Sequence, residues 1–263
     1  MQNSTRILGV KITTMSGEKI LEYVVSELEK PRLRGEKIVI FTPNPEQISA
    51  ASRKPELKNV LNEADIALPD GIGIVWAAKI LGKPIKARIS GIDFMQNLVK
   101  SIPASLAGGL ERPVVIGCLG GQPGVAEEAA ECLSREAGSR SAGKKIASNI
   151  TIGYASDTYD KAKMIQSDID ILFVGLGFPK QERWIIEHRD EVPAKVIMAV
   201  GGSLDFLSGR VARAPFLIRQ IDLEWLFRLI IQPMRFFRQL QIWHFGGLIL
   251  WEALSSRLKR LKT

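Results

Sequence analysis

The sequence predicts an α/β protein in which a parallel sheet carries helices on both faces, followed by a helical C-terminal appendage. Short apolar runs typical of buried strands alternate with longer stretches whose apolar residues recur at helical spacing. Several runs end in polar or glycine-rich loops, which gather at the carboxyl edge of a parallel sheet. After residue 210 the strands stop and the chain becomes helical, aromatic and basic. We therefore expect an α/β domain over residues 1–209 and an appendage over residues 210–263.

The first half of the chain alternates between strand and helix patterns. Ser16 is a good helix-capping residue, and apolar residues follow it at every third or fourth position. The expected elements are, in order, a strand at 7–12, a helix from Ser16 to about Lys30, a strand at 38–41, a helix after Pro45, a strand at 66–68, and helices at 71–81 and 90–102.

The second half repeats the alternation. The expected elements are a strand at 114–118, a helix at 125–137, a strand at 145–150, a helix at 157–167, a strand at 171–174, a helix that ends near His188, and a strand at 195–200. Strands that alternate with helices in this way predict a Rossmann-like parallel sheet, because each crossover helix returns the chain to the same edge.

Polar side chains follow two of the expected strands. The run at 38–41 leads into Thr42 and Asn44, and the run at 66–68 leads into Asp70. Because ligands bind outside the carboxyl ends of parallel strands, a hydroxyl, an amide and a carboxylate are expected to face one site. The alternative is structural: Pro-Asp-Gly is a good turn sequence, and Thr42 and Asn44 are suitable caps for the next helix.

Two glycine-rich loops, at 117–124 and 175–180, also follow strands and open helices. Glycines let the backbone approach a phosphate, and helix N-termini favour an anion. Neither loop matches the dinucleotide fingerprint or a Walker loop, since Lys180 stands where a third glycine is needed. Each alone is explained by a tight strand-to-helix turn, whereas two on one sheet favour a nucleotide or another phosphate ligand.

Asp168 and Asp170 form the Asp-x-Asp pattern that holds a metal in many sugar-nucleotide transferases. Here the pair precedes its strand, so we expect it at the wrong edge of the sheet for a ligand. No set of His and Cys residues has metal-ligand spacing, and no metal or cofactor is predicted. Glu182 lies in the first turn of a helix, where it favours the helix dipole without any function.

The formal net charge of +8 is concentrated at the C-terminal end. Residues 210–263 contain ten Lys and Arg residues against Asp222, Glu224 and Glu252. Aromatic residues lie among them, including Trp225, Phe227, Phe236, Phe237, Trp243 and Trp251. Basic and aromatic residues on a helical segment indicate an anionic membrane surface as partner, rather than nucleic acid.

The chain shows no apolar run long enough for a signal peptide and no segment that predicts a membrane-spanning helix. Its two cysteines, Cys118 and Cys132, make no disulfide framework and suit a reducing compartment. We therefore expect a cytoplasmic protein, peripheral on the inner face of the cell membrane.

Seven segments together resemble a known family. They are ILGVKI at 7–12, TPNPEQ at 42–47, ADIALPDGIGIV at 64–75, RISGID at 88–93, GLGFPKQERW at 175–184, GGSLDFLSGRVARAP at 201–215 and DLEWLFRLIIQPMRFFR at 222–238. In this order they are similar to the WecG/TagA/CpsF glycosyltransferases, family 26 of the sugar transferases. The resemblance covers essentially the whole chain; one departure is Asp222, where many members carry glycine.

The resemblance implies an inverting transfer of an N-acetylmannosamine-type sugar from a UDP donor to N-acetylglucosamine on a polyprenyl diphosphate, without a metal. It implies Asp70 as the catalytic base. The other implied active-site positions are Thr42, Asn44, Arg88 and Gln181 in the body and Arg228, Arg235 and Arg238 in an appendage that closes over the site at the membrane. An Asp in a closed crevice can accept the hydroxyl proton, and arginines can hold the departing diphosphate.

Two other function classes stay open from the sequence. A nicotinamide-dependent oxidoreductase fits the sheet but not the imperfect glycine loops. A non-enzymatic membrane-surface binding protein would use the tail and leave the polar cluster around Asp70 without a role. The oligomeric state is also open, with a homo-oligomer among the alternatives.

Overall fold

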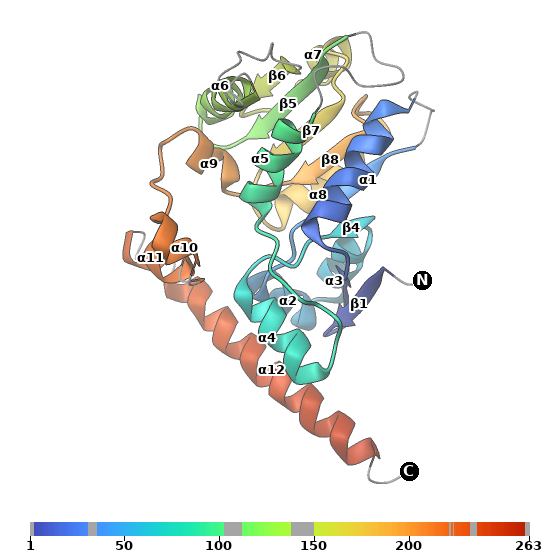
Figure 1. The fold of residues 1–263 in the computed structure, drawn as a ribbon, viewed down its shortest axis with the longest axis vertical. Helices are drawn as coiled ribbons and strands as arrows, with labels where there is room; N and C mark the ends of the chain where they lie inside the picture. The colour runs from blue at the N-terminus through green and yellow to red at the C-terminus, as the bar shows by residue number, and fades with distance from the viewer. Residues whose placement is uncertain are drawn as a thin grey trace.

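The fold is a central parallel sheet between two helical layers, and one long helix lies against one of these layers (Figure 1). The computed structural model describes residues 3–30, 36–102, 112–137, 150–220, 222, 224–231 and 236–260.

The main sheet has six parallel strands in the order β4-β3-β8-β7-β5-β6. The strands are β3 (Ile38–Phe41), β4 (Ile66–Ala67), β5 (Val114–Gly120), β6 (Ile150–Ser156), β7 (Ile171–Gly175) and β8 (Val196–Ala199). The predicted Rossmann-like parallel sheet is confirmed. The strand expected at 145–150 begins only at its last residue, and residues 145–149 lie outside the described part of the chain.

Helices cover both faces of this sheet, as predicted. One face packs against α1 (Gly17–Glu29), α5 (Gly91–Ser101), α6 (Val125–Ala137) and α9 (Ser203–Leu207). The other packs against α2 (Pro45–Arg53), α3 (Pro55–Asn62), α4 (Ile72–Leu81), α7 (Lys161–Gln166) and α8 (Lys180–His188). Strand β3 feeds both layers, since Ile38 and Ile40 belong to the first core and Val39 and Phe41 to the second.

The single strand expected at 7–12 is wrong. Residues 4–13 form an antiparallel hairpin, β1 (Ser4–Ile7) and β2 (Val10–Thr13), which is a separate two-stranded sheet. Its turn has Leu8 at φ 49° and Gly9 at φ 83°, the left-handed pair that a two-residue hairpin turn requires. The Asn62 side chain fastens this turn to the body, because its Nδ2 donates to the Gly9 carbonyl over 3.1 Å.

After α9, the described part of the chain continues with α10 (Phe216–Gln220), α11 (Glu224–Ile231) and α12 (Phe236–Arg260). Helix α12 runs as a long rod beside α2 and α4 (Figure 1). Its Phe245 and Ile249 are 4% and 2% exposed and belong to the core of the α2–α4 layer. Ser49 on α2 also bonds the Nδ1 of His244 on α12 over 2.8 Å. The appendage is therefore seated on the body through both apolar and polar contacts.

Candidate active site

The ends of β3 and β4 bring three of the predicted site residues into neighbouring positions. The two strands pair in parallel, and the Asp70 N–H donates to the Pro43 carbonyl over 3.1 Å. The start of α5 closes against them. A β-carbon built on Gly91 would lie 3.0 Å from Thr42 Cγ2 and 3.8 Å from Asp70 Oδ2, so glycine is what lets this helix end approach. Thr42 and Asp70 thus lie close together beside the start of α5.

Asp70 has the electrostatics of a proton acceptor. The pKa of Asp70 is raised to about 6, mainly because its carboxyl is buried and in smaller part because of nearby Glu224. Arg88, the backbone N–H of Gly91 and Arg228 act in the opposite direction and limit the rise in this pKa. A carboxylate with a pKa near 6 is ionised at neutral pH yet binds a proton far more readily than an exposed aspartate.

Arg88 lies beside this carboxylate and is bound by the appendage. The Ile89 N–H donates to the Pro69 carbonyl over 3.0 Å, which holds the segment against the Asp70 loop. The Arg88 guanidinium is 3.2 Å from the Asp222 carboxylate, and its side chain is only 17% exposed. The Arg88 side chain is therefore held mostly out of the solvent, against the appendage.

Arg228 reaches the site from α11. Its guanidinium lies 4.2 Å from the centroid of the Phe206 ring, a cation–π contact. A β-carbon on Gly202 would lie 3.1 Å from Arg228 Nη2, so the arginine rests on the loop after β8. Ion pairs of Arg213 with Asp93 over 2.6 Å and with Glu224 over 3.5 Å fix α11 to α5.

The sequence spacing of Arg228, Arg235 and Arg238 predicts that they share one face of a single helix, unless Pro233 kinks that helix or begins a second one. Arg228 is on α11 and Arg238 is on α12, which are separate helices. Arg235 and the side chain of Arg238 lie outside the described residues. Two helices in place of one agree with the alternative in which Pro233 ends the single helix.

Gln181 joins the loops after β7 and β8. Its side chain is 1% exposed, and its Oε1 accepts from Gly177 N over 3.2 Å and from Gly201 N over 3.0 Å. Its Nε2 donates to Glu182 Oε1 over 2.8 Å. The amide orientation is thereby set, and one Nε2 hydrogen is directed elsewhere than to Glu182. Gly177, at φ 78°, has open space where a side chain would stand.

Glu182 is the residue that sequence reasoning missed. It is fully buried, and burial raises its pKa to about 7, with the Gln181 hydrogen bond lowering it in part. A sequence signal exists: Glu182 stands three positions before the buried Ile185, so both occupy the inner face of α8. A helix-dipole role alone would place this carboxyl in water.

The two residues after β3 have structural partners. Asn44 caps α2, since its Oδ1 accepts from Gln47 N over 3.0 Å, and Thr42 Oγ1 lies 3.5 Å from the Ala199 carbonyl. Gln47 is 6% exposed, and its Oε1 has no hydrogen-bond partner among the described residues. The structural interpretation of Asn44 as a cap is therefore correct, and a binding role for it stays a prediction.

The glycine-rich loop at 117–124 is explained by packing. A β-carbon on Gly120 would lie 2.7 Å from the Gly175 carbonyl oxygen, and the Gly121 N–H donates to that oxygen over 3.2 Å. A β-carbon on Gly124 would lie 2.6 Å from Arg210 Nη2. These glycines allow close contact between the two loops and the start of the appendage.

Asp168 and Asp170 lie before β7, as predicted, at the opposite end from the site. Asp170 is 3% exposed and binds Arg112 through both carboxylate oxygens, over 2.8 and 3.1 Å. It also accepts from the Val115 N–H over 2.8 Å. The pair serves to fasten β5 to β7.

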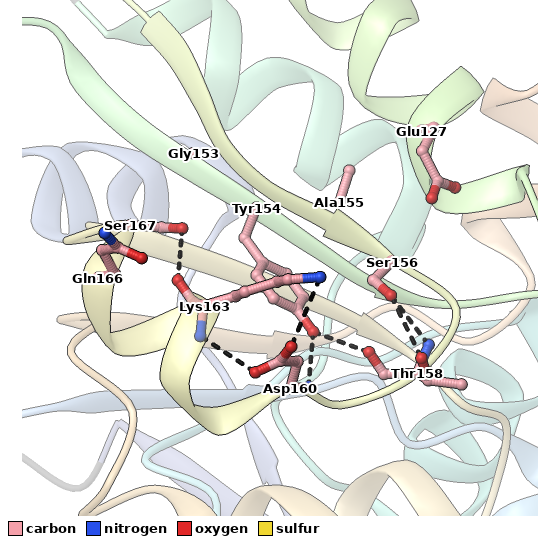
Figure 2. Close-up of a pocket in the computed structure, with 10 residues that line it drawn as sticks. All are labelled: Glu127, Gly153, Tyr154, Ala155, Ser156, Thr158, Asp160, Lys163, Gln166 and Ser167. Carbon is pink, nitrogen blue, oxygen red and sulfur yellow. Dashed lines mark hydrogen bonds and ion pairs between the residues drawn. The ribbon is translucent and has the colours of Figure 1, made fainter.

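A polar pocket of about 520 Å³ lies at the other edge of the sheet. Figure 2 shows its lining side chains, which come mainly from β6, α7 and the loop between them. Tyr154 Oη donates to the Thr158 carbonyl over 2.7 Å and accepts from Asp160 N over 3.0 Å, so the loop bonds to itself. The pocket contains no predicted site residue and is roughly 24 Å from β4, at five strand spacings.

Within the described residues, no helix is both long and apolar enough to cross a membrane. The candidate active site consists of Asp70 and the charged groups that act on its pKa, Arg88, Glu224 and Arg228.

Comparison with known proteins identifies the family. A model of the glycosyl transferase WecG/TagA/CpsF family matches residues 5–259. The N-acetylglucosaminyldiphosphoundecaprenol N-acetyl-beta-D-mannosaminyltransferase of Bacillus spizizenii is 36% identical over 83% of this chain and 81% of the relative. Proteins of the same name from Bacillus subtilis (83% of this chain, 81% of the relative) and Staphylococcus aureus strain MRSA252 (75% and 74%) are each 32% identical. The chain belongs to the glycosyl transferase WecG/TagA/CpsF family.

Proposed function

We propose that this protein transfers an N-acetylmannosamine-type sugar from a UDP donor to N-acetylglucosamine on a polyprenyl diphosphate, with inversion at the sugar carbon. The relatives' shared name, which states this sugar and this lipid-linked acceptor, supports the assignment. The observation that carries it to this chain is Asp70, a carboxylate with its pKa raised to about 6 between Arg88 and Arg228.

In this proposal Asp70 takes the proton from the acceptor hydroxyl as that oxygen attacks the sugar carbon. The bond from sugar to UDP breaks, and the departing diphosphate gains negative charge. Arg88 and Arg228 are the two cations that lower the pKa of Asp70, so we assign them to the diphosphate. Gln181 offers an N–H from the first turn of α8, and we assign Thr42 and Asn44 to the same polar surface.

The second part of the proposal concerns residues 210–263. We assign them to a membrane-associating appendage on the cytoplasmic face of the cell membrane, with Arg228, Arg235 and Arg238 facing substrate phosphates. Exposed apolar side chains on α11 support this, with Trp225 at 43% and Ile230 at 70% exposure. Basic residues add attraction to anionic lipid of roughly 1 kcal/mol each, weakened by salt.

The test is a panel of UDP-sugars with a lipid diphosphate-N-acetylglucosamine acceptor, followed by UDP release and product mass. We expect UDP release only when both substrates are present, and an added mass of one N-acetylhexosamine. A nicotinamide dinucleotide that binds where UDP does not would support the oxidoreductase instead. Vesicle binding without any transfer across the panel would support the non-enzymatic alternative.

A further inference from the structure

Helix α4 has an exposed face that the core does not explain. Trp76 is 64% exposed and Ile80 is 49% exposed, and Lys79 between them is exposed as well. At about 100° per residue these three side chains fall within an arc of roughly 100°. The opposite side of the helix is buried through Ile74, Ala77 and Ala78.

The charge on this face has one sign. Helix α4 and the segment that follows it contain Lys79, Lys83 and Lys86, and residues 71–87 contain no acidic residue. A tryptophan and an isoleucine flanked by lysines are typical of a helix lying in the interface of an anionic bilayer, where the ring is buried and the amines meet phosphate.

Helix α12 packs beside α4 and also has exposed apolar side chains. Its buried face is marked by Phe245 and Ile249. Six large apolar side chains are 50–81% exposed on the opposite face: Leu240, Trp243, Leu250, Trp251, Leu254 and Leu258. At about 100° per residue they lie within an arc of roughly 100° centred opposite Phe245. The helix is therefore apolar on two sides, and the body covers only one.

We propose that α4, through Trp76, Lys79 and Ile80, is a second lipid-contacting element that lies on an anionic bilayer together with α12. This inference rests on the proposed function and extends the membrane surface from the appendage to the catalytic body. A second copy of the chain fits the face less well. A two-fold contact would set Lys79 and Lys83 against themselves with no acidic residue of α4 to pair them.

The position of α4 gives this contact a consequence for catalysis. The helix begins at Ile72, two residues after Asp70, and Trp76 stands only four residues further on. At 1.5 Å per residue the lipid-facing ring is about 6 Å along the axis from the first residue of the helix. A bilayer that receives Trp76 and Ile80 would hold the phosphates of an acceptor lipid at the level of the Asp70 loop.

The first experiment measures binding of the full chain to vesicles of phosphatidylglycerol and phosphatidylcholine, without substrates. We expect Trp76→Ala/Ile80→Ser to weaken partitioning by about tenfold or more, because two apolar side chains no longer enter the interface. Tyr23→Ala/Ile165→Ser is the matched control, since those residues are 45% and 50% exposed on α1 and α7. Equal partitioning of parent and test variant would overturn the proposal.

A second experiment reports contact directly. Ile80→Cys in a Cys132→Ser background is labelled with a polarity-sensitive dye, Cys118 being fully buried with its thiol pKa raised to about 12. We expect a blue shift on vesicle binding, and none for a label at Ile165→Cys. A bound protein whose Ile80 label does not shift would overturn the proposal, as would a dimer that Trp76→Ala dissociates. Neither readout uses sugar transfer, so failure of the proposed function is recognised separately.

Discussion

The Arg88 guanidinium and the Asp222 carboxylate lie 3.2 Å apart, and this ion pair ties the loop before α5 to the segment between α10 and α11. Asp222 adopts φ 59°, a left-handed conformation that glycine or asparagine accepts more readily than aspartate. Many members of the resembled family carry glycine at this position. The left-handed backbone gives a physical reason for that glycine, because glycine adopts this conformation without strain. The carboxylate stands against the very arginine that we assign to the donor diphosphate.

We therefore predict that Asp222→Asn increases UDP affinity severalfold, because the diphosphate no longer competes with a carboxylate for Arg88. Asparagine also tolerates the left-handed backbone, so the change isolates the charge. Isothermal titration with UDP measures the effect, and Arg88→Ala, expected to weaken UDP binding, provides the opposite control. Weaker UDP binding in Asp222→Asn would mean that the pair promotes closure instead.

Replacing the proposed base should separate chemistry from binding. Asp70→Asn is expected to lower the transfer rate about 10²–10⁴-fold, the usual loss for a general base, while UDP binding is largely retained. Asp190→Asn, at an exposed position, is the matched control. Near-normal turnover by Asp70→Asn would remove Asp70 from the catalytic role.

The raised pKa of Asp70 also predicts the pH dependence of transfer. Below a pKa of about 6 the carboxyl is protonated and cannot act as a base, so kcat/KM should fall as pH decreases through 6. The check is a rate profile from pH 4.5 to 8. An acid limb far below pH 6 would contradict the assignment of this limb to Asp70.

The raised pKa of Asp70 also predicts that removing its charge stabilises the folded protein at high pH. The folded protein holds the Asp70 proton more tightly than an unfolded chain, where the pKa is near 3.8, so stability falls as pH rises between 4 and 6. Above pH 6 the buried charge lowers stability by on the order of 3 kcal/mol. Asp70→Asn should therefore raise Tm at pH 8 and change it little at pH 4, where parent and variant are both neutral. An equal shift at both pH values would contradict this.

Gln181 and Glu182 allow the structural role of a side chain to be separated from its binding role. In the exchange Gln181→Glu/Glu182→Gln, a carboxylate accepts from Gly177 N and Gly201 N, and the amide at 182 donates to it. The loops stay joined, but the N–H proposed to face the donor is lost. We expect a Tm close to that of the parent and UDP affinity reduced about tenfold or more.

Glu182→Ala serves as its counterpart. This change leaves the Gln181 Nε2 without its acceptor and should cost about 1–3 kcal/mol of unfolding free energy. If the exchanged pair binds UDP like the parent, Gln181 acts only in holding the two loops together.

A chelator tests the metal assignment. Asp170 already binds Arg112 and the Val115 N–H, at the far end of β7 from the site. We expect transfer to survive EDTA unchanged. Loss of transfer that Mg²⁺ or Mn²⁺ restores would show a metal requirement that this placement does not account for.

How much the sequence could predict depended on whether a pattern was local. Strands with continuous apolar runs, such as Ile38–Phe41, and helices with a clear cap, such as the one after Ser16, are in their predicted places. The hairpin was missed because leucine rarely adopts the left-handed conformation that Leu8 has in this turn, although glycine, at Gly9, often does. The division of residues 4–13 into two strands therefore could not be predicted from their local apolar pattern alone.

The site shows the same division. Thr42 and Asp70 each follow the carboxyl end of a parallel strand, which the alternation of elements predicts. The pairing of β3 with β4 then brings the two residues together. The burial of Glu182 depends on how α8 packs, and the Arg88–Asp222 pair joins residues far apart in the chain. For the tail arginines, spacing alone predicts one helical face, whereas Pro233 allows the two helices α11 and α12 that the structure has.

The order of the sheet also governs how the protein is made. Strand β3 lies between β4 and β8, and β8 is the last strand of the chain. At about 5–20 residues per second, a ribosome needs roughly 10–30 s after β3 to complete β8. Until then one edge of β3 stays unpaired, a hazard for aggregation that chaperones would have to cover. Helix α12 follows all six strands of the main sheet in the sequence, so it is synthesised after them. Its exposed apolar face therefore leaves the ribosome only when the sheet can already form.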